Sequence, residues 1–329
     1  MDASNDRLGD ANAAPTGSTT PPVEAHDALW PSLPLAAWQD TYATLHMWTQ
    51  IVGKVPLALC PPVNHWWAVA LQVTPLGLAT VSIPYGTDAF QITFDFFNQT
   101  LWVRTGSGRG RAMALYPRPV ADFYRELMAM LRSLDINVTI NTLPQEVSNP
   151  IPCDEDFEHA AYDAEAVMRW WRITQQSSRV LQGFRGRFAG KSSPVHFFWG
   201  SFDLALTRFS GRRAPPRPEA DRITREAYSH EEWSCGFWPG SVDGGVREPA
   251  YYAYASPEPA GFAEARIVPA SAAYHRDLSE YILPYEAVRT AVDPDQALHA
   301  FAQSTYDAAA TLASWDRAAL EHDPPQPAG

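Results

Sequence analysis

Hydrophobic residues recur with two different periods along this chain, and the period in each segment predicts its secondary structure. Where apolar residues return every three or four positions, they share one face of a helix. This pattern predicts helices over residues 34–52, 119–134, 164–184 and 294–315. Gly53 is predicted to end the first helix, because glycine readily adopts the left-handed conformation that closes many helices.

Other segments alternate apolar and polar residues, which is typical of half-buried strands. In residues 90–97 the apolar Phe90, Ile92 and Phe94 alternate with polar side chains. Strands are predicted at residues 55–59, 65–73, 78–83, 90–97, 100–104, 112–116, 136–143, 195–209, 232–238 and 250–256. Together the elements predict an α+β fold of mainly antiparallel sheets with helices packed on them.

The two ends of the chain differ in composition from its middle. Residues 1–30 are rich in Asp, Ala, Pro, Thr and Ser, with few large apolar side chains. Such a segment cannot bury enough surface to offset the entropy of ordering, so it is predicted to be a disordered acidic tail. Residues 321–329 are predicted to be a second disordered tail. Between the tails we predict one integrated domain with two α+β halves, 31–150 and 151–320.

A local signature occurs once in each half. Gly53 and Lys54 precede a Pro-Val-Asn-His sequence that ends at His65, and Gly190 and Lys191 precede a Pro-Val-His sequence that ends at His196. Each signature follows a helical segment that contains tryptophans, and the chain has no other lysines. The spacing of about 130 residues predicts an internal duplication with pseudo-twofold symmetry. It also predicts that the two histidines begin equivalent strands.

Charge and composition exclude several classes of protein. The chain has 25 Lys and Arg against 37 Asp and Glu, a formal net charge of −12, and no basic stretch. Such a balance disfavours nucleic-acid binding, which depends on neutralising phosphates. No apolar run reaches the roughly 20 residues that span a bilayer, and the first residues lack the basic and apolar regions expected of a signal peptide. The three sparse cysteines do not suggest a disulfide framework. We therefore predict a cytoplasmic protein, with an oligomeric state that the sequence leaves open.

Residues 193–213 combine ionisable groups with large aromatic rings. If this segment is one strand, then His196, Phe198 and Arg208 lie on one face, and Asp203 lies on the other with Trp199. Buried charges are costly unless they are paired, and such surroundings shift pKa values. The alternative is a structural network of ion pairs and hydrogen bonds.

A second candidate segment, residues 222–240, contains His230 beside Glu231. Such a pair could act as a general acid and base, or could bind a metal. With His65, His196 and a carboxylate, His230 would complete a plausible shell for a transition metal such as zinc or iron. No spacing rule enforces this assembly, and consecutive charges before a strand also fit a solvated loop.

Several longer motifs resemble a bacterial family known only as a domain of unknown function, number 5996. They are Asn64-His65-Trp66-Trp67, Ile83-Pro84-Tyr85-Gly86, Phe94-Asp95-Phe96, residues 193–213, Ala227-Tyr228-Ser229-His230-Glu231, Gly236-Phe237-Trp238-Pro239-Gly240 and Leu283-Pro284-Tyr285. The resemblance extends from residue 33 to about residue 320. It implies one integrated domain across both halves, and it supplies no activity, ligand or catalytic role.

Three functions remain open from the sequence. The first is an enzyme whose site lies between the halves, in a pocket lined by aromatic residues. Its predicted catalytic residues are His196, Asp203, His230 and Glu231, and its predicted ligand-binding residues are His65, Trp66, Trp67, Phe198, Trp199 and Arg208. The forked guanidinium of Arg208 suits a small anionic ligand, because it bonds carboxylate or phosphate with two donors. The alternatives are a non-catalytic binder of small ligands and a scaffold for a protein partner.

Overall fold

The structure, a computed structural model, describes residues 27–241 and 245–322. Its described residues form the predicted α+β fold, around one twelve-stranded antiparallel sheet. The strands are β1 (Leu71–Val73), β2 (Leu78–Ala79), β3 (Ile83–Tyr85), β4 (Asp88–Asp95), β5 (Thr100–Thr105), β6 (Gly110–Ala114), β7 (His196–Phe198), β8 (Asp203–Arg213), β9 (His230–Trp238), β10 (Ala250–Ser256), β11 (Ala273–His275) and β12 (Glu280–Pro284). Their order is β11-β12-β10-β9-β8-β7-β1-β2-β4-β5-β6, and β3 pairs with β4 outside this path.

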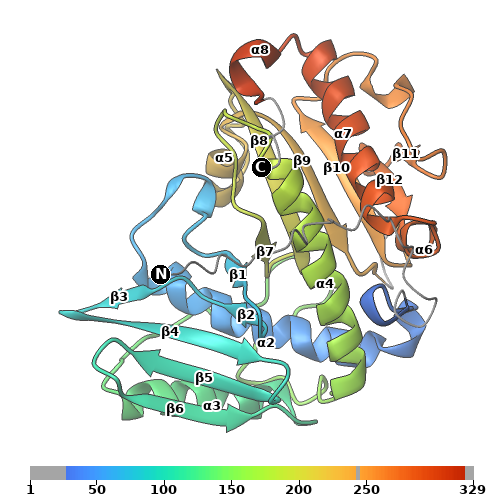
Figure 1. Ribbon diagram of the computed structural model, residues 1–329. Helices are drawn as coiled ribbons and strands as arrows, with labels where there is room; N and C mark the ends of the chain where they lie inside the picture. The colour runs from blue at the N-terminus through green and yellow to red at the C-terminus, as the bar shows by residue number, and fades with distance from the viewer. Residues whose placement is uncertain (1–26, 242–244, 323–329) are drawn as a thin grey trace, which may run out of the picture.

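The two parts of the chain supply neighbouring parts of this sheet. Strands β1–β6 come from the first part and β7–β12 from the second, and they join where β1 pairs with β7, with Gln72 opposite His196. Figure 1 shows the strands turning from nearly horizontal in β4–β6 to steep in β8–β10. This rotation is the accumulated twist of a large sheet.

Helices cover the sheet according to where their apolar faces lie. The helices are α2 (Gln39–Leu59), α3 (Val120–Ser133), α4 (Ala164–Arg185), α5 (Arg222–Ala227), α6 (Tyr285–Arg289), α7 (Pro294–Leu312) and α8 (Arg317–Leu320), with 3-10 turns η1 (Leu35–Ala37), η2 (Asn64–Trp66) and η3 (Phe262–Glu264). The long helices α4 and α7 contact each other; α4 packs on β8 and α7 on β9 and β10, while α3 packs on β6.

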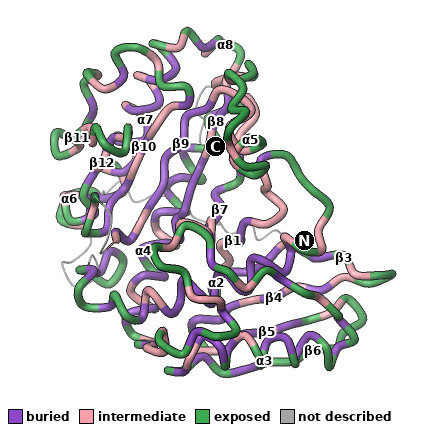
Figure 2. Tube along the Cα trace, turned by 180° about the vertical axis from the view of Figure 1, so that it is seen from behind, coloured by how far each residue is buried: buried purple, intermediate pink, exposed green. Residues whose placement is uncertain are grey.

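Large aromatic side chains fill the core between α4, α7 and the sheet. Trp170, Trp171 and Trp233 are fully buried there. Figure 2 shows buried residues running through the strands, whereas α5 and its flanking chain are exposed or half-buried. The face of the sheet away from α4 and α7 therefore has a thinner cover, and a cavity lies on this face.

The structure corrects several predicted boundaries. Helix α2 does not end at Gly53 but continues to Leu59, so residues 55–59 are not a strand. Gly53 packs directly under the Trp199 ring, and this close approach explains the glycine better than a helix end does. Residues 136–143 are not a strand either. The predicted strand 195–209 is a hairpin, because the chain turns between β7 and β8 and Phe202 has a left-handed φ of 58°.

The predicted duplication is not confirmed. His65 lies in the 3-10 turn η2 with a left-handed φ of 55°, whereas His196 begins strand β7, so the two histidines are not structurally equivalent. Of the predicted tails, residues 1–26 and 323–329 lie outside the described part of the chain. At the inner boundaries, Trp30 is buried in the core and Glu321 accepts hydrogen bonds from Tyr306 and Arg317.

Candidate ligand-binding site

A cavity of about 510 Å³ lies on the face of the sheet opposite α4 and α7. Strand β8 has residues on both the cavity side and the helix side of the sheet, because successive side chains of a strand point to opposite faces. Thr207 lines the cavity, while the next residue, Arg208, donates to the Phe184 carbonyl of α4. The volume falls in the range of sites for small organic molecules.

Polar side chains of three neighbouring strands form the floor of this cavity. Alternate residues of β8, β9 and β10 face it: Asp203, Ala205, Thr207, Glu232, Ser234, Tyr252 and Tyr254. A Cβ atom at Gly236 would overlap both the Leu204 carbonyl and the Tyr252 ring. Glycine at this position therefore lets Tyr252 lie close over β9 and donate its hydroxyl proton to Asp203.

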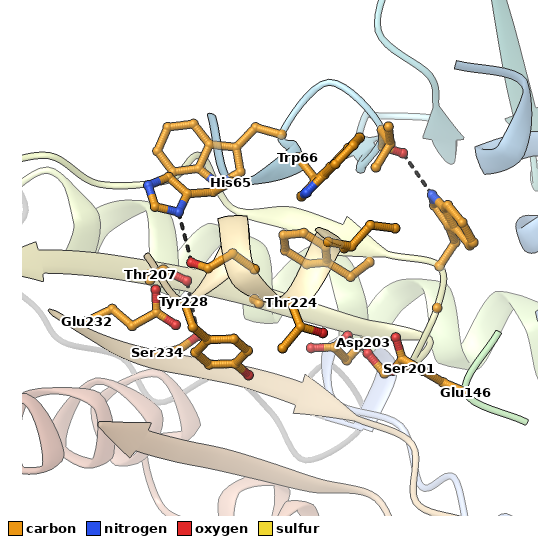
Figure 3. Close-up of a pocket in the computed structure, with 18 of the residues that line it drawn as sticks. His65, Trp66, Glu146, Ser201, Asp203, Thr207, Thr224, Tyr228, Glu232 and Ser234 are labelled. Atoms are coloured by element: carbon orange, nitrogen blue, oxygen red, sulfur yellow. Dashed lines mark hydrogen bonds between the residues drawn. The ribbon is translucent and has the colours of Figure 1, made fainter. Parts of the chain in front are cut away.

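Two segments far apart in the sequence cover the floor. They are η2, with Trp67 directly after it, and α5, and they contact each other. Figure 3 shows His65 and Trp66 across the cavity from the sheet residues. Both have left-handed φ values, 55° and 59°, which are unfavourable for large side chains. Backbone strain of this kind is concentrated at functional sites, and here it turns two large rings toward one cavity.

One end of the cavity presents carboxylates together with a hydroxyl group. Asp203 is buried and accepts a hydrogen bond from Ser201 at 2.6 Å as well as the one from Tyr252. Burial raises the pKa of Asp203, and these two hydrogen bonds oppose the rise. Glu146 lies beside Ser201 and Asp203 (Figure 3), and desolvation and the Asp203 charge both raise its pKa.

Helix α2 fixes the two loops that form this end. His46 Nε2 lies 3.0 Å from the Trp199 carbonyl and 2.8 Å from the Gly200 carbonyl. Burial lowers the pKa of His46 to about 4, so the ring is neutral, and Nε2–H is the donor because both carbonyls can only accept. One turn later, Gln50 donates to the Gln145 carbonyl at 2.7 Å and accepts from its amide at 2.8 Å. These contacts hold the β7–β8 turn and the Glu146 loop.

The other end of the cavity contains Glu232. Its side chain is buried, and no hydrogen bond or ion pair from a described residue reaches its carboxyl group. Burial raises the pKa of Glu232 to about 8, although the charges of Arg217 and Lys191 lower it. Near neutral pH this carboxyl group therefore keeps its proton and is available as a general acid.

Six of the ten predicted site residues line the cavity. They are His65, Trp66, Trp67, Phe198, Trp199 and Asp203. The Trp199 indole donates to the Val69 carbonyl at 2.8 Å, which holds its ring in the cavity wall. The structure thus brings together most of the predicted ligand-binding side chains and one predicted catalytic carboxylate.

The other four predicted residues lie outside the lining. His196 is buried, and burial beside Arg185 lowers its pKa to about 4. His230 lies at the edge, with its ring 5.6 Å from that of His65. Glu231 accepts from Arg212 at 2.7 Å.

Arg208, the fourth of these residues, faces α4. Its guanidinium is 3.6 Å from the Phe184 ring centroid and 4.5 Å from that of Tyr306. Arg208 does not line the cavity, so a small anionic ligand bound there would not contact this residue, contrary to the prediction.

Residues that the sequence patterns did not indicate also line the cavity. They include Glu146, Ser201, Thr207, Tyr228, Glu232, Ser234, Tyr252 and Tyr254. The strand pattern could have indicated Glu232. Trp233 and Cys235 are buried on the helix-covered side of β9, so Glu232, which is next to Trp233, points to the opposite side. The strand period therefore assigns the cavity face to Glu232 and not to Glu231.

The predicted metal shell is not assembled among the described residues. No three His, Cys, Asp or Glu side chains in this part of the chain are placed to hold a metal ion. His65 and His230 are close together, but His196 does not join them at the cavity.

These features define an α+β protein with a covered cavity on one face of a large antiparallel sheet. The chain matches the model of a family described as a family of unknown function (DUF5996) over residues 30–322, and it belongs to that family. The resemblance found in its motifs is thereby confirmed. No curated protein and no solved structure matches the chain significantly. No helix in the described residues is long and apolar enough to cross a membrane.

Proposed function

We propose that this protein is an enzyme that acts on a small organic molecule bound in the cavity between η2, α5 and the sheet. The observation that carries the proposal is Glu232, a buried carboxyl group that faces the cavity with no hydrogen-bond partner among the described residues. Burying such a group is costly, and strongly perturbed carboxyl groups in clefts are typical of acid–base sites. Glu232 would serve as the general acid.

The end of the cavity opposite Glu232 favours a particular kind of ligand. Asp203 and Glu146 offer hydrogen-bond acceptors, and the rings of Trp66, Phe198 and Trp199 offer flat apolar surfaces. Hydroxyl or amino groups of a ligand would donate to the carboxylates, while its carbon skeleton packs against the rings. We therefore propose a substrate that bears hydroxyl or amino groups.

Replacing Asp203 by Asn is expected to weaken ligand binding about tenfold or more, because an amide loses the charge that strengthens such hydrogen bonds. A panel of amino and hydroxyl compounds would be screened by thermal shift, and each hit titrated against wild type and Asp203→Asn. Glu231→Gln is the control, since Glu231 is paired with Arg212 outside the cavity. Circular dichroism and the unfolding midpoint of the free variant would show that it is folded. Equal binding by a folded Asp203→Asn protein, or no hit at all, would refute the proposed site.

Replacing Glu232 by Gln is expected to reduce turnover of a bound hit by about a hundredfold, since an amide cannot donate a proton as an acid does. Substrate binding should change little. Mass spectrometry would follow conversion of each hit by wild type, Glu232→Gln and Glu231→Gln. Binding without turnover by the wild-type protein would instead identify a non-catalytic binding protein, and normal turnover by Glu232→Gln would exclude this residue as the acid.

A further inference from the structure

The only two lysines of the chain have very different surroundings. Lys54 lies in α2, is 3% exposed, and donates a hydrogen bond to the Leu143 carbonyl. Lys191 lies just before β7, is half-buried, and its Nζ contacts the cavity-lining His65, although Lys191 is not itself a lining residue. The two amines therefore differ in accessibility.

Aromatic rings and an imidazole surround the Lys191 amine. Its Nζ lies 2.5 Å from His65 Nε2, 4.9 Å from the Phe209 ring centroid and 5.6 Å from that of Trp67. All three neighbours line the cavity. No carboxylate of the described residues lies within ion-pair distance of Lys191, although Glu226 and Glu232 are near enough to influence its pKa.

The hydrogen bonds of His65 determine which group is the donor. His65 Nδ1 lies 2.9 Å from the Ala227 carbonyl, which can only accept, so Nδ1 carries the proton. In the neutral ring Nε2 is then an acceptor directed at Lys191. Desolvation lowers the pKa of His65, and the neighbouring Lys191 and His230 lower it further, so the neutral ring is favoured. Desolvation also lowers the pKa of Lys191, while the charges of Glu226 and Glu232 oppose this effect, so the amine loses its proton more readily than that of a free lysine.

We propose that Lys191 is a nucleophilic lysine that forms an imine with an aldehyde or ketone bound in the cavity. This inference rests on the proposed small-molecule site and specifies the class of its substrate. A molecule with a carbonyl group at one end and hydroxyl or amino groups at the other would match the two polar ends of the cavity.

The residues at this end supply the proton transfers that imine formation needs. The Lys191 nitrogen forms a bond to the carbonyl carbon, and the electron pair of the C=O double bond moves to oxygen. One proton leaves the nitrogen for His65 Nε2 and then passes to that oxygen, which gives a carbinolamine. Glu232 then donates its proton to the hydroxyl group, which leaves as water while the nitrogen lone pair forms the C=N bond. The products are one water, a protonated imine and the Glu232 carboxylate.

Reductive trapping tests this proposal directly. The folded full-length protein would be incubated with glyceraldehyde and sodium cyanoborohydride, because hydride addition converts an imine into a stable secondary amine. Peptide mass spectrometry would then compare modification of Lys191, Lys54 and the α-amino group over time. We expect Lys191 to be modified about tenfold faster than Lys54, and His65→Phe to slow the reaction at Lys191 about tenfold.

Lys191→Arg is the matched variant, since it keeps a long basic side chain at this position but has no nucleophilic amine. It should lose the rapid modification while keeping the unfolding midpoint and circular dichroism of the wild type. Equal modification of both lysines, or a rate at Lys191 unaffected by His65→Phe in a folded variant, would overturn the imine. If ligand binding still depends on Asp203, that outcome would refute the imine but not the small-molecule site. Failure of the imine proposal can therefore be distinguished from failure of the proposed function.

Discussion

Glu232→Gln is expected to stabilise the protein by roughly 3 to 5 kcal/mol at pH 9 and to change its stability little at pH 4. The pKa of Glu232 rises from its ordinary value of 4.5 to about 8 because of burial. Between those two values the unfolded chain releases a proton that the folded protein keeps, so wild-type stability falls as pH rises. A glutamine side chain cannot ionise and avoids this loss.

Urea unfolding of wild type and variant at several pH values would measure the difference. Glu231→Gln is the matched control on the neighbouring residue, where Glu231 is partly exposed and paired with Arg212. Its effect should stay within about 0.5 kcal/mol at every pH. A stabilisation by Glu232→Gln that is the same at pH 4 and pH 9 would contradict the raised pKa of Glu232 and, with it, the proposed general acid.

Gly53→Ala is expected to destabilise the protein by about 2 to 3 kcal/mol, although alanine normally favours a helix interior by about 1 kcal/mol over glycine. A Cβ atom at Gly53 would overlap the Trp199 indole ring. That ring cannot move freely, because it is 6% exposed and its Nε1 donates to the Val69 carbonyl at 2.8 Å. Steric overlap therefore outweighs the gain in helix propensity.

The control for this substitution is Gly183→Ala in α4. Apart from its chain neighbours and the backbone of α4, no atom lies within 4 Å of a Cβ atom placed at Gly183, so alanine should stabilise the protein by a few tenths to about 1 kcal/mol. Chemical denaturation of both variants gives the comparison. Opposite signs are expected, and a Gly53→Ala protein as stable as wild type would show that Trp199 is not held in the cavity wall as described. Because Trp199 lines the cavity, Gly53→Ala should also weaken binding of any ligand found by the thermal-shift screen.

The sequence correctly predicted most of the elements in which apolar residues recur at a regular spacing. Helices α3, α4 and α7 and strands β4, β5, β9 and β10 lie within a few residues of their predicted positions. Periodicity succeeds here because each element buries one face, and the spacing of apolar residues records that face locally. The same rule correctly placed Asp203 and Arg208 on opposite sides of β8.

Turns and close contacts were harder to predict. The break between β7 and β8 places Phe198 on the same face as its partner Asp203, whereas one continuous strand would have put them on opposite faces. Glycine is common at helix ends, but Gly53 lies inside α2. The glycine here is explained by close packing against Trp199, about 150 residues away in the chain. In both cases contacts with distant residues override a local preference.

The sequence by itself determined the α+β class, the family and the aromatic and ionisable side chains from which the site is built. Only the tertiary structure decided which of them meet: His65 with Lys191 and the Ala227 carbonyl, and Asp203 with Tyr252. It also separated Arg208 and Glu231 from the cavity. The physical reason is that periodicity fixes the face on which a side chain lies. The partner across that face depends on strand pairing, turn position and packing between segments more than a hundred residues apart.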